Sequence, residues 1–346
     1  PFAAPSADRP PAPCRARGAP AKWRAMALLA SDRVIDTARR FIPIAATLLL
    51  CTLAGWSLYR VSQTVSLGEI GGALHAVPLS AVVTAICATI GSFAAFILQD
   101  YLALKRASAA LSLPRAAAGS FIAQSIAHVT GFAILVGGAL RARYFLASGL
   151  ALTAILSVQA SFSVSFGLAD SLLVGLSTLL EPVLAAKATH LPIAWLRLAA
   201  LLVMLAALGV FALVTFLRRH RLALRFNLAV SPPRTLALQV LCSIIDLLFV
   251  AAALFLLLPA GLDVGYVQIL ACYVIAATLG MWSHVPAGLG VFEATILLLV
   301  HPPHEQLAHV LAALIAFRAI YHLMPFALGC AMLAAVETAR RFSRAR

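Results

Sequence analysis

Two polar stretches interrupt long apolar segments of this sequence, and they constrain the fold more than any other feature. The first is Gln124–Gly131, and the second is Ser283–Gly290. Each divides its apolar segment into pieces shorter than the about 20 residues that a helix needs to cross a bilayer. Paired interruptions in two halves of a chain indicate a binding site near the middle of the membrane, as in transporters built from repeats.

The composition indicates a membrane protein. The sequence is 62% hydrophobic and only 11% charged, whereas soluble proteins are nearer half apolar and a quarter charged. Because the apolar residues form long runs, we predict an all-α polytopic membrane bundle. The formal net charge of +14 does not indicate nucleic-acid binding, because the Lys and Arg residues lie in tails and short loops without a basic face or an aromatic platform.

The apolar runs predict about six full spans and two interrupted regions. Residues 1–40 are expected to be a disordered basic tail in which Met26 is a candidate start, 41–339 the membrane domain, and 340–346 a basic tail. The predicted full spans are 41–59, 78–104, 150–180, 194–217, 234–258 and 307–337, and the interrupted regions are 116–140 and 265–300.

The basic loops predict the orientation of the spans. The N-terminal tail, the 105–115 loop, the 218–234 loop and the C-terminal tail are rich in Lys and Arg, so all are expected on the cytoplasmic side. This holds only if 116–140 enters the membrane and returns to the same side. The 265–300 region then begins and ends outside, as two spans or as a second hairpin, and the short 291–300 piece favours the hairpin.

These assignments predict two halves of opposite direction. Each half is a span, a re-entrant hairpin and a span, which makes an inverted-topology repeat. Irregular backbone at membrane depth must be buried in protein or line a wet cavity. We therefore predict that the tips at 128–131 and 284–290 meet, from opposite sides, in a shared hydrated cavity.

Ionisable residues within predicted spans indicate function, because they are costly there. Glu293 and Arg318 are expected to pair, as a structural lock or as substrate contacts. His322 lies four residues after Arg318, on the same helix face. His128 and His284 stand at the two tips, as proton-relay groups, headgroup ligands or ordinary helix–helix hydrogen-bond partners.

Three aspartates and two further arginines are also candidates. Asp246 has no partner nearby in the sequence and is expected to face the cavity, whereas the role of Asp170 is open. Asp100 is followed by Lys105 and Arg106, which predicts a surface ion pair. Arg141 and Arg143 follow Gly137-Gly138, and a flexible glycine pair beside two guanidinium groups suits a phosphate site. Anchoring on the cytoplasmic side is the alternative.

Common catalytic and metal motifs are missing from the sequence. His304–His309 has one residue too many for HExxH, there is no GxxxxGK[ST] or GxSxG motif, and the cysteines form no CxxC pair. We therefore expect no metal, no cofactor and no catalytic residues in this chain.

The segment Ser283–Glu293 is the most specific of several that carry a family resemblance. The supporting segments are Leu135–Tyr144, Leu179–Pro182, Ser243–Asp246 and Phe317–His322. Together they resemble, over about 41–340, the membrane domain of the lysyl-phosphatidylglycerol synthases, the multiple peptide resistance factor family. Val136 stands where this family leads us to expect Thr, and Ala287 where it leads us to expect Gly, which leaves the preferred lipid open.

The resemblance implies a bacterial inner-membrane flippase for aminoacylated phosphatidylglycerol. In this family a separate C-terminal domain attaches the amino acid from charged tRNA, and the family name would suggest phosphatidylglycerol lysyltransferase. The sequence ends at Arg346, soon after the last predicted span, so we expect the membrane domain without the synthase domain. Cationic lipid in the outer leaflet would weaken the binding of cationic peptides.

The candidate substrate-binding residues follow from the headgroup, which carries a phosphate and ammonium groups. The phosphate suits an arginine, and the ammonium suits Glu293, Asp246 or Asp170. A non-catalytic scaffold for a separately encoded synthase and a coupled small-solute transporter are the alternatives. The lipid, the energy coupling and the oligomeric state stay open. The full candidate set is Arg141, Arg143, His128, Asp246, His284, Glu293, Arg318 and His322.

Overall fold

The computed structural model describes residues 67–107, 111–130, 133–219 and 231–344. The predicted basic tail 1–40 and the predicted span 41–59 lie outside the described residues. Within the described ranges the chain is helical and contains no strand. Five of the helical stretches are long and apolar enough to cross a membrane, so the predicted all-α polytopic bundle is confirmed.

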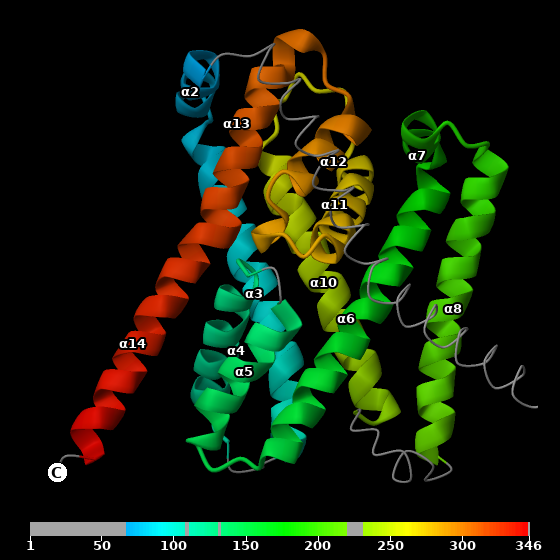
Figure 1. Ribbon diagram of the computed structural model, residues 1–346. Helices are drawn as coiled ribbons and strands as arrows, with labels where there is room; N and C mark the ends of the chain where they lie inside the picture. Colours follow the sequence, from blue (N-terminus) through cyan, green and yellow to red (C-terminus); the bar gives the residue numbers. More distant parts are fainter. Residues whose placement is uncertain (1–66, 108–110, 131–132, 220–230, 345–346) are drawn as a thin grey trace, which may run out of the picture. The chain divides into compact units, whose positions relative to one another are not determined.

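Among the described residues, the helix bounds agree with the predicted spans to within about three residues, except that the last helix continues to Arg344 and not to 337. Figure 1 labels the elements in chain order. The helices are α2 (Leu67–His75), α3 (Leu79–Ala107), α4 (Leu113–Ala127), α5 (Ala133–Leu146), α6 (Leu152–Leu180), α7 (Pro182–Thr189), α8 (Ile193–Arg219), α10 (Pro233–Leu257), α11 (Tyr266–Trp282), α12 (Val291–Val300), α13 (Leu307–Phe317) and α14 (Met324–Arg344). The 3-10 turns η1 (Pro286–Gly288) and η2 (His304–Gln306) and the π-helical segment η3 (Arg318–Leu323) complete the described chain.

Local sequence signals explain where several helices begin and end. Proline occupies one of the first positions of α4, α7 and α10, where its missing N–H costs nothing and its fixed φ suits a helix. Lys105 and Arg106 lie in the last turn of α3, where positive charge interacts favourably with the helix dipole.

Two hairpins of short helices enter the bundle from opposite ends. We call the end that holds Lys105, Arg106 and Arg218 the basic end. The hairpin α4–α5 starts from the basic end, and the hairpin formed by α11, η1 and α12 starts from the other end (Figure 1). Each is too short to cross a membrane twice, as the interruptions predict.

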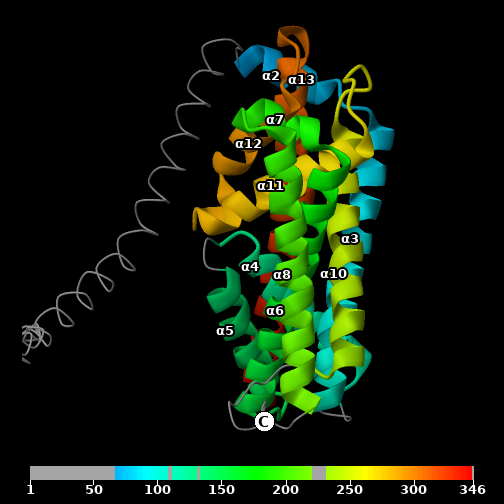
Figure 2. The same cartoon turned by 90° about the vertical axis from the view of Figure 1, so that its right-hand side faces the viewer.

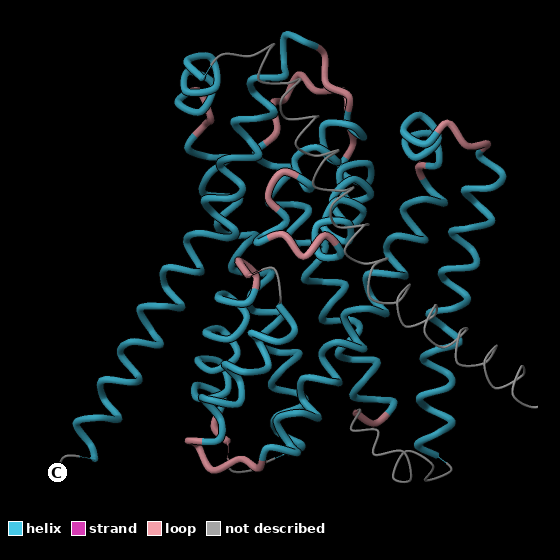
Figure 3. The backbone as a smooth tube through the Cα atoms, in the orientation of Figure 1, coloured by secondary structure: helices cyan, strands magenta, loops and turns pink. Residues whose placement is uncertain are grey.

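The hairpin tips approach each other near the middle of the long helices. The backbone tube in Figure 3 shows the loop after α4 below the loop that contains η1. The turned view in Figure 2 shows the same closeness. The order α3, hairpin, α6 is thus repeated with reversed direction by α10, hairpin and the continuous helix α13–η3–α14.

The core lies where the two halves meet. α3 and α10 form the most extensive helix pair in the described chain. Ala85, Val250, Leu254 and Ile269 are buried in the cluster they share with α11 and α13. By contrast, α8 is only 11% buried over its most apolar stretch, so most of its side chains are available to face lipid.

Candidate functional site

The second hairpin tip, 283–290, contains an unusual concentration of left-handed backbone. φ is 56° at His284, 52° at Ala287, 61° at Gly288 and 80° at Gly290. This conformation costs about 1–2 kcal/mol for a residue with a Cβ atom, and such residues cluster at functional sites. Ala287, where the family leads us to expect glycine, occupies one of these positions. Gly288 packs against Gly280, since a Cβ atom added to Gly288 would lie 3.0 Å from the Cα atom of Gly280.

Arg318 fixes this tip to the last long helix. Its Nε donates to Oε1 of Glu293 over 2.7 Å, and its Nη1 donates to the carbonyl of Ala287. The other carboxylate oxygen of Glu293 accepts the N–H of Gly290 over 2.8 Å. The Arg318 guanidinium also lies 5.1 Å from the centre of the Phe292 ring. The predicted pairing of Glu293 with Arg318 is confirmed, and both charges are satisfied.

The first hairpin tip, 128–131, begins with a histidine that lies among aromatic rings. His128 Nε2 lies 2.8 Å from the amide nitrogen of Gln124. The centre of its ring is 5.4 Å from that of Phe96 and 5.7 Å from that of Tyr321. Its Nδ1 is buried and has no hydrogen-bond partner among the described residues. His128 therefore anchors the first tip against α3 and η3.

The π-helical segment η3 contacts both tips. Arg318, at its start, holds the second tip, and Tyr321, one turn later, packs on His128 of the first tip. His322 packs edge-on against Tyr321 at 5.2 Å between ring centres, and its Nδ1 likewise finds no hydrogen-bond partner in the part of the chain that the structure describes. Single turns of π-helix occur frequently at functional sites. The tips are thus brought to one segment, whereas the shared hydrated cavity stays a prediction.

Arg141 is buried, and each of its three guanidinium nitrogens contacts a polar side chain. It is 1% exposed, and its Nε donates to Oδ2 of Asp100 over 2.9 Å. Nη1 donates to Gln159 over 2.9 Å, and Nη2 donates to Gln124 over 3.3 Å. The guanidinium carbon lies 4.9 Å from the centre of the Phe162 ring. A phosphate could reach Arg141 only by replacing one of these partners.

The predicted surface ion pair of Asp100 with Lys105 and Arg106 is wrong. Asp100 is 1% exposed and pairs with Arg141 instead, because the first hairpin folds back against α3 and supplies the counter-ion that a buried carboxylate needs. The prediction of a flexible glycine pair is also wrong, since Gly137 and Gly138 lie inside α5. A Cβ atom on Gly137 would lie 3.1 Å from Nη1 of Arg141, so this glycine makes room for the guanidinium.

Arg143 and His284 are the exposed members of the candidate set. The side chain of Arg143 is 62% exposed and its Nε lies 2.9 Å from Oε1 of Glu337 in α14. His284 is exposed at the second tip, with Nδ1 2.8 Å from the carbonyl oxygen of Trp282. These two residues are therefore accessible from outside the packed core.

Asp246 and Asp170 are buried carboxyl groups that accept hydrogen bonds from hydroxyl groups. Ser92 of α3 donates to Oδ1 of Asp246, and the Tyr321 hydroxyl lies 3.3 Å from Oγ of Ser92. Thr278 of α11 donates to Asp170 over 2.9 Å. Asp246 is thus enclosed by protein and does not line an open surface.

Sequence reasoning missed the polar partners of these residues. Ser92, Gln124, Gln159 and Tyr321 bind or contact candidate residues. Gln124 stands in the polar interruption itself, and Tyr321 adjoins His322, which are signals that could have found them. The residues Ser92 and Gln159 lie singly in apolar helices, where one polar residue is common.

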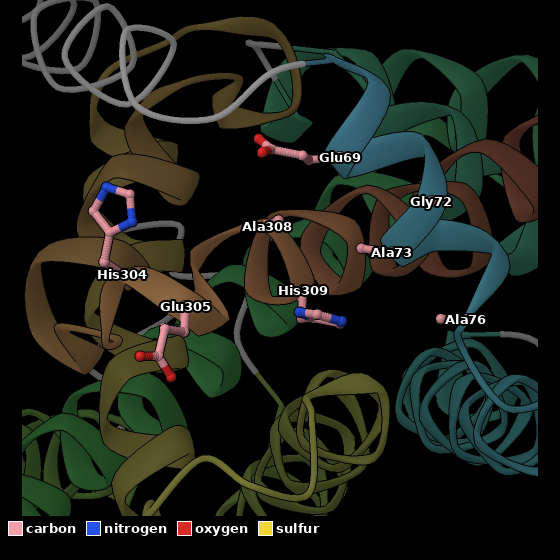
Figure 4. Close-up of a pocket in the computed structure, with 8 residues that line it drawn as sticks. All are labelled: Glu69, Gly72, Ala73, Ala76, His304, Glu305, Ala308 and His309. Atoms are coloured by element: carbon pink, nitrogen blue, oxygen red, sulfur yellow. The ribbon is translucent and has the colours of Figure 1, made fainter.

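A separate cavity of about 390 Å³ lies between α2 and the start of α13. Figure 4 shows Glu69 on α2, and His304, Glu305 and His309 on the other wall. None of the predicted site residues lines it. In the described part of the chain, no group of three or more His, Cys, Asp or Glu side chains could hold a metal ion.

The comparison with known families decides the identity of this bundle. Residues 41–329 match the family described as lysylphosphatidylglycerol synthase TM region. The chain belongs to this family. The match includes both hairpins and the η3 segment, so every candidate residue lies in the family's transmembrane region.

Two relatives are membrane or uncharacterised proteins of bacteria. The uncharacterized protein slr0712 of Synechocystis is 26% identical over 240 residues, which are 69% of this chain and 74% of the relative. The inner membrane protein YbhN of Escherichia coli is 29% identical over 132 residues, which are 38% of this chain and 41% of the relative. The name of YbhN places that relative in the inner membrane, which agrees with a multi-pass membrane protein.

Proposed function

We propose that this protein moves lysyl-phosphatidylglycerol or a related phospholipid between the leaflets of a bacterial inner membrane. The main support for this proposal is that both hairpin tips contact one segment, η3, deep within the bundle. Charged and imidazole groups at such depth are costly and mark substrate pathways. Membership of the lysylphosphatidylglycerol synthase family supports this class of lipid.

The headgroup passes between the tips while the acyl chains stay in lipid. Arg318 and Glu293 form an ion pair that closes this path. Breaking a buried ion pair is costly because it leaves an uncompensated charge. A headgroup with a phosphate and an ammonium group can replace both partners together, with the phosphate on Arg318 and the ammonium on Glu293. A singly charged headgroup would satisfy only one of them.

The exposed arginine Arg143 makes the first contact with the lipid phosphate. It stands toward the basic end of α5 with a side chain that is 62% exposed, whereas Arg141 is held by Asp100. Positive charge concentrates on the cytoplasmic side of membrane proteins, so the basic end and both termini are assigned to the cytoplasm. Lipid would then enter from the inner leaflet.

A leaflet assay tests the proposed function. Purified protein is reconstituted into liposomes with lysyl-phosphatidylglycerol in one leaflet, and the lipid amine in the other leaflet is labelled with an impermeant reagent. We expect rapid lipid movement with the wild type. The rate should fall at least roughly tenfold in Glu293→Gln and Arg318→Gln, because each substitution removes one of the two charges that the headgroup would contact; a tenfold loss corresponds to about 1.4 kcal/mol. Glu305→Gln, which removes an exposed carboxylate in η2, just before the start of α13 and away from every proposed lipid contact, is the matched control.

The alternatives give different results in the same assay. A scaffold for a separate synthase would leave the leaflet distribution unchanged and would tolerate Glu293→Gln in cells. A solute transporter would move a water-soluble solute but no lipid. Lipid movement at the rate of protein-free liposomes would overturn the proposal.

A further inference from the structure

Asp246 is a carboxyl group in the middle of the bundle, and the described residues offer it no counter-ion. It lies near the centre of α10 and is 1% exposed. None of the ion pairs between described residues includes it. Its recorded hydrogen bond comes from the hydroxyl of Ser92. An ionised carboxylate in such a place is strongly unfavourable. The buried negative charge of Asp246 therefore has to be neutralised by a bound cation, either a proton or a metal ion.

The neighbouring charged groups are occupied elsewhere and do not supply this cation. Arg318 is engaged by Glu293 and by the carbonyl of Ala287. Arg141, on the first hairpin, is engaged by Asp100. The other titratable groups that face this region from α6, α11, η3 and the first tip are Asp170, Tyr273, Tyr321, His322 and His128.

Asp246 is linked to both hairpin tips through side chains of α3 and η3. The Tyr321 hydroxyl lies 3.3 Å from Oγ of Ser92, and Tyr321 belongs to η3, which holds the second tip through Arg318. Phe93, the residue after Ser92, packs against both His128 and Tyr321, with ring centres 6.0 and 5.9 Å apart. A change in charge at Asp246 would therefore act on α3 and η3, the two elements against which the tips rest.

We propose that Asp246, Ser92 and Tyr321 form a binding site for a monovalent cation, a proton or Na⁺, whose binding drives the headgroup movement. Carboxyl groups inside membrane bundles mark ion pathways and proton relays. The carboxyl and hydroxyl oxygens can bond a proton between them or coordinate Na⁺, which is a hard cation. This inference rests on the proposed function, and cation binding at this site would supply the energy for the lipid movement.

An infrared measurement tests cation binding without lipid movement. Spectra of the protein in lipid films are recorded while either pH or Na⁺ is varied, for wild type and for Asp246→Asn. We expect a carboxyl band that changes with one of these variables in the wild type and is missing from Asp246→Asn. Asp170→Asn, a second buried carboxyl, should keep this band. A wild-type carboxyl spectrum insensitive to both variables, or a difference spectrum between wild type and Asp246→Asn without a responding band, would overturn the site.

A gradient measurement tests the coupling. Proteoliposomes with lysyl-phosphatidylglycerol receive either a pH gradient at equal Na⁺ or a Na⁺ gradient at equal pH. We expect one gradient to change the wild-type rate several-fold, and the ratio of rates with and without that gradient to fall to about one in Asp246→Asn. Lipid movement that ignores both gradients would overturn the coupling but leave the proposed function intact. If the wild type moves no lipid, the proposed function fails, and the infrared result still decides whether the cation site exists.

Discussion

At the scale of single residues, this membrane bundle contains two arginine–carboxylate pairs of opposite character. Arg141 and Asp100 are each about 1% exposed, whereas the side chains of Arg143 and Glu337 are 62% and 29% exposed. Removing one partner of a buried pair leaves an uncompensated charge, but exposed pairs contribute little because water and ions screen them. Arg141 and Arg143 are only two residues apart, and both pair with a carboxylate. We therefore expect the loss of the partner to affect stability strongly at Arg141 and weakly at Arg143.

Asp100→Asn should reveal this difference. We expect it to destabilise the protein by about 3–5 kcal/mol, because the Arg141 charge would remain buried without its counter-ion. Thermal unfolding in detergent would measure the loss. Glu337→Gln is the matched control and should leave the melting temperature nearly unchanged. Equal effects of the two substitutions would contradict the assignment of Asp100 and Arg141 as the structural pair.

At the scale of elements, close helix contacts at glycine determine how the hairpins pack. A Cβ atom on Gly329 of α14 would lie 2.0 Å from Oγ of Ser125 in α4. Ser125 is buried on the first hairpin, so it has little room to move. The close approach of α14 to the first hairpin thus depends on this glycine.

Gly329→Ala should therefore weaken the contact between α14 and the first hairpin. We expect a loss of about 1–3 kcal/mol from overpacking, measured as a lower melting temperature. Gly209 in α8, which has no atoms within 4 Å of an added Cβ atom, is the control. Gly209→Ala should be neutral or stabilising, because alanine is favoured over glycine inside helices by about 1 kcal/mol. A stable Gly329→Ala variant would refute the close packing.

The elements themselves were predicted well from the sequence, but the partner of Asp100 was not. The break at Ser283–Gly290 and the adjoining ten-residue helix α12 follow from the polar interruption. The pairing of Asp100 with Arg141 joins residues 41 positions apart, and the nearby Lys105 and Arg106 gave the wrong partner. Local sequence determines helix existence, whereas counter-ions are chosen by which helices pack together.

At the scale of the whole molecule, the opposite entry of the two hairpins predicts which loops face which side of the membrane. The loop at Ala147 joins the first hairpin to α6 at the basic end, and Asp263 lies in the loop that precedes the second hairpin at the other end. Both residues are exposed. The positive-inside rule assigns Ala147 to the cytoplasm and Asp263 to the outside.

Cysteine labelling tests this topology. In a background without native cysteines, Asp263→Cys should react with an impermeant maleimide in intact cells, and Ala147→Cys should react only after permeabilisation. Mass-shifted protein on a gel would report the labelling. Reaction of Ala147→Cys in intact cells would mean that the segment 113–146 crosses the membrane fully, and the re-entrant hairpin would be refuted.

The sequence by itself determined the membrane class, the spans and the two interruptions. The length of an apolar run and a polar break within it are local properties, and they decide whether a helix can cross the bilayer. The sequence also determined that Glu293 and Arg318 would pair, since two costly charges in neighbouring segments stabilise each other. Only the tertiary structure decided that Arg141 pairs with Asp100, that Asp246 has no counter-ion among the described residues, and that η3 contacts both tips. These facts depend on which helix faces come together over long distances in the chain, and no local pattern encodes that choice.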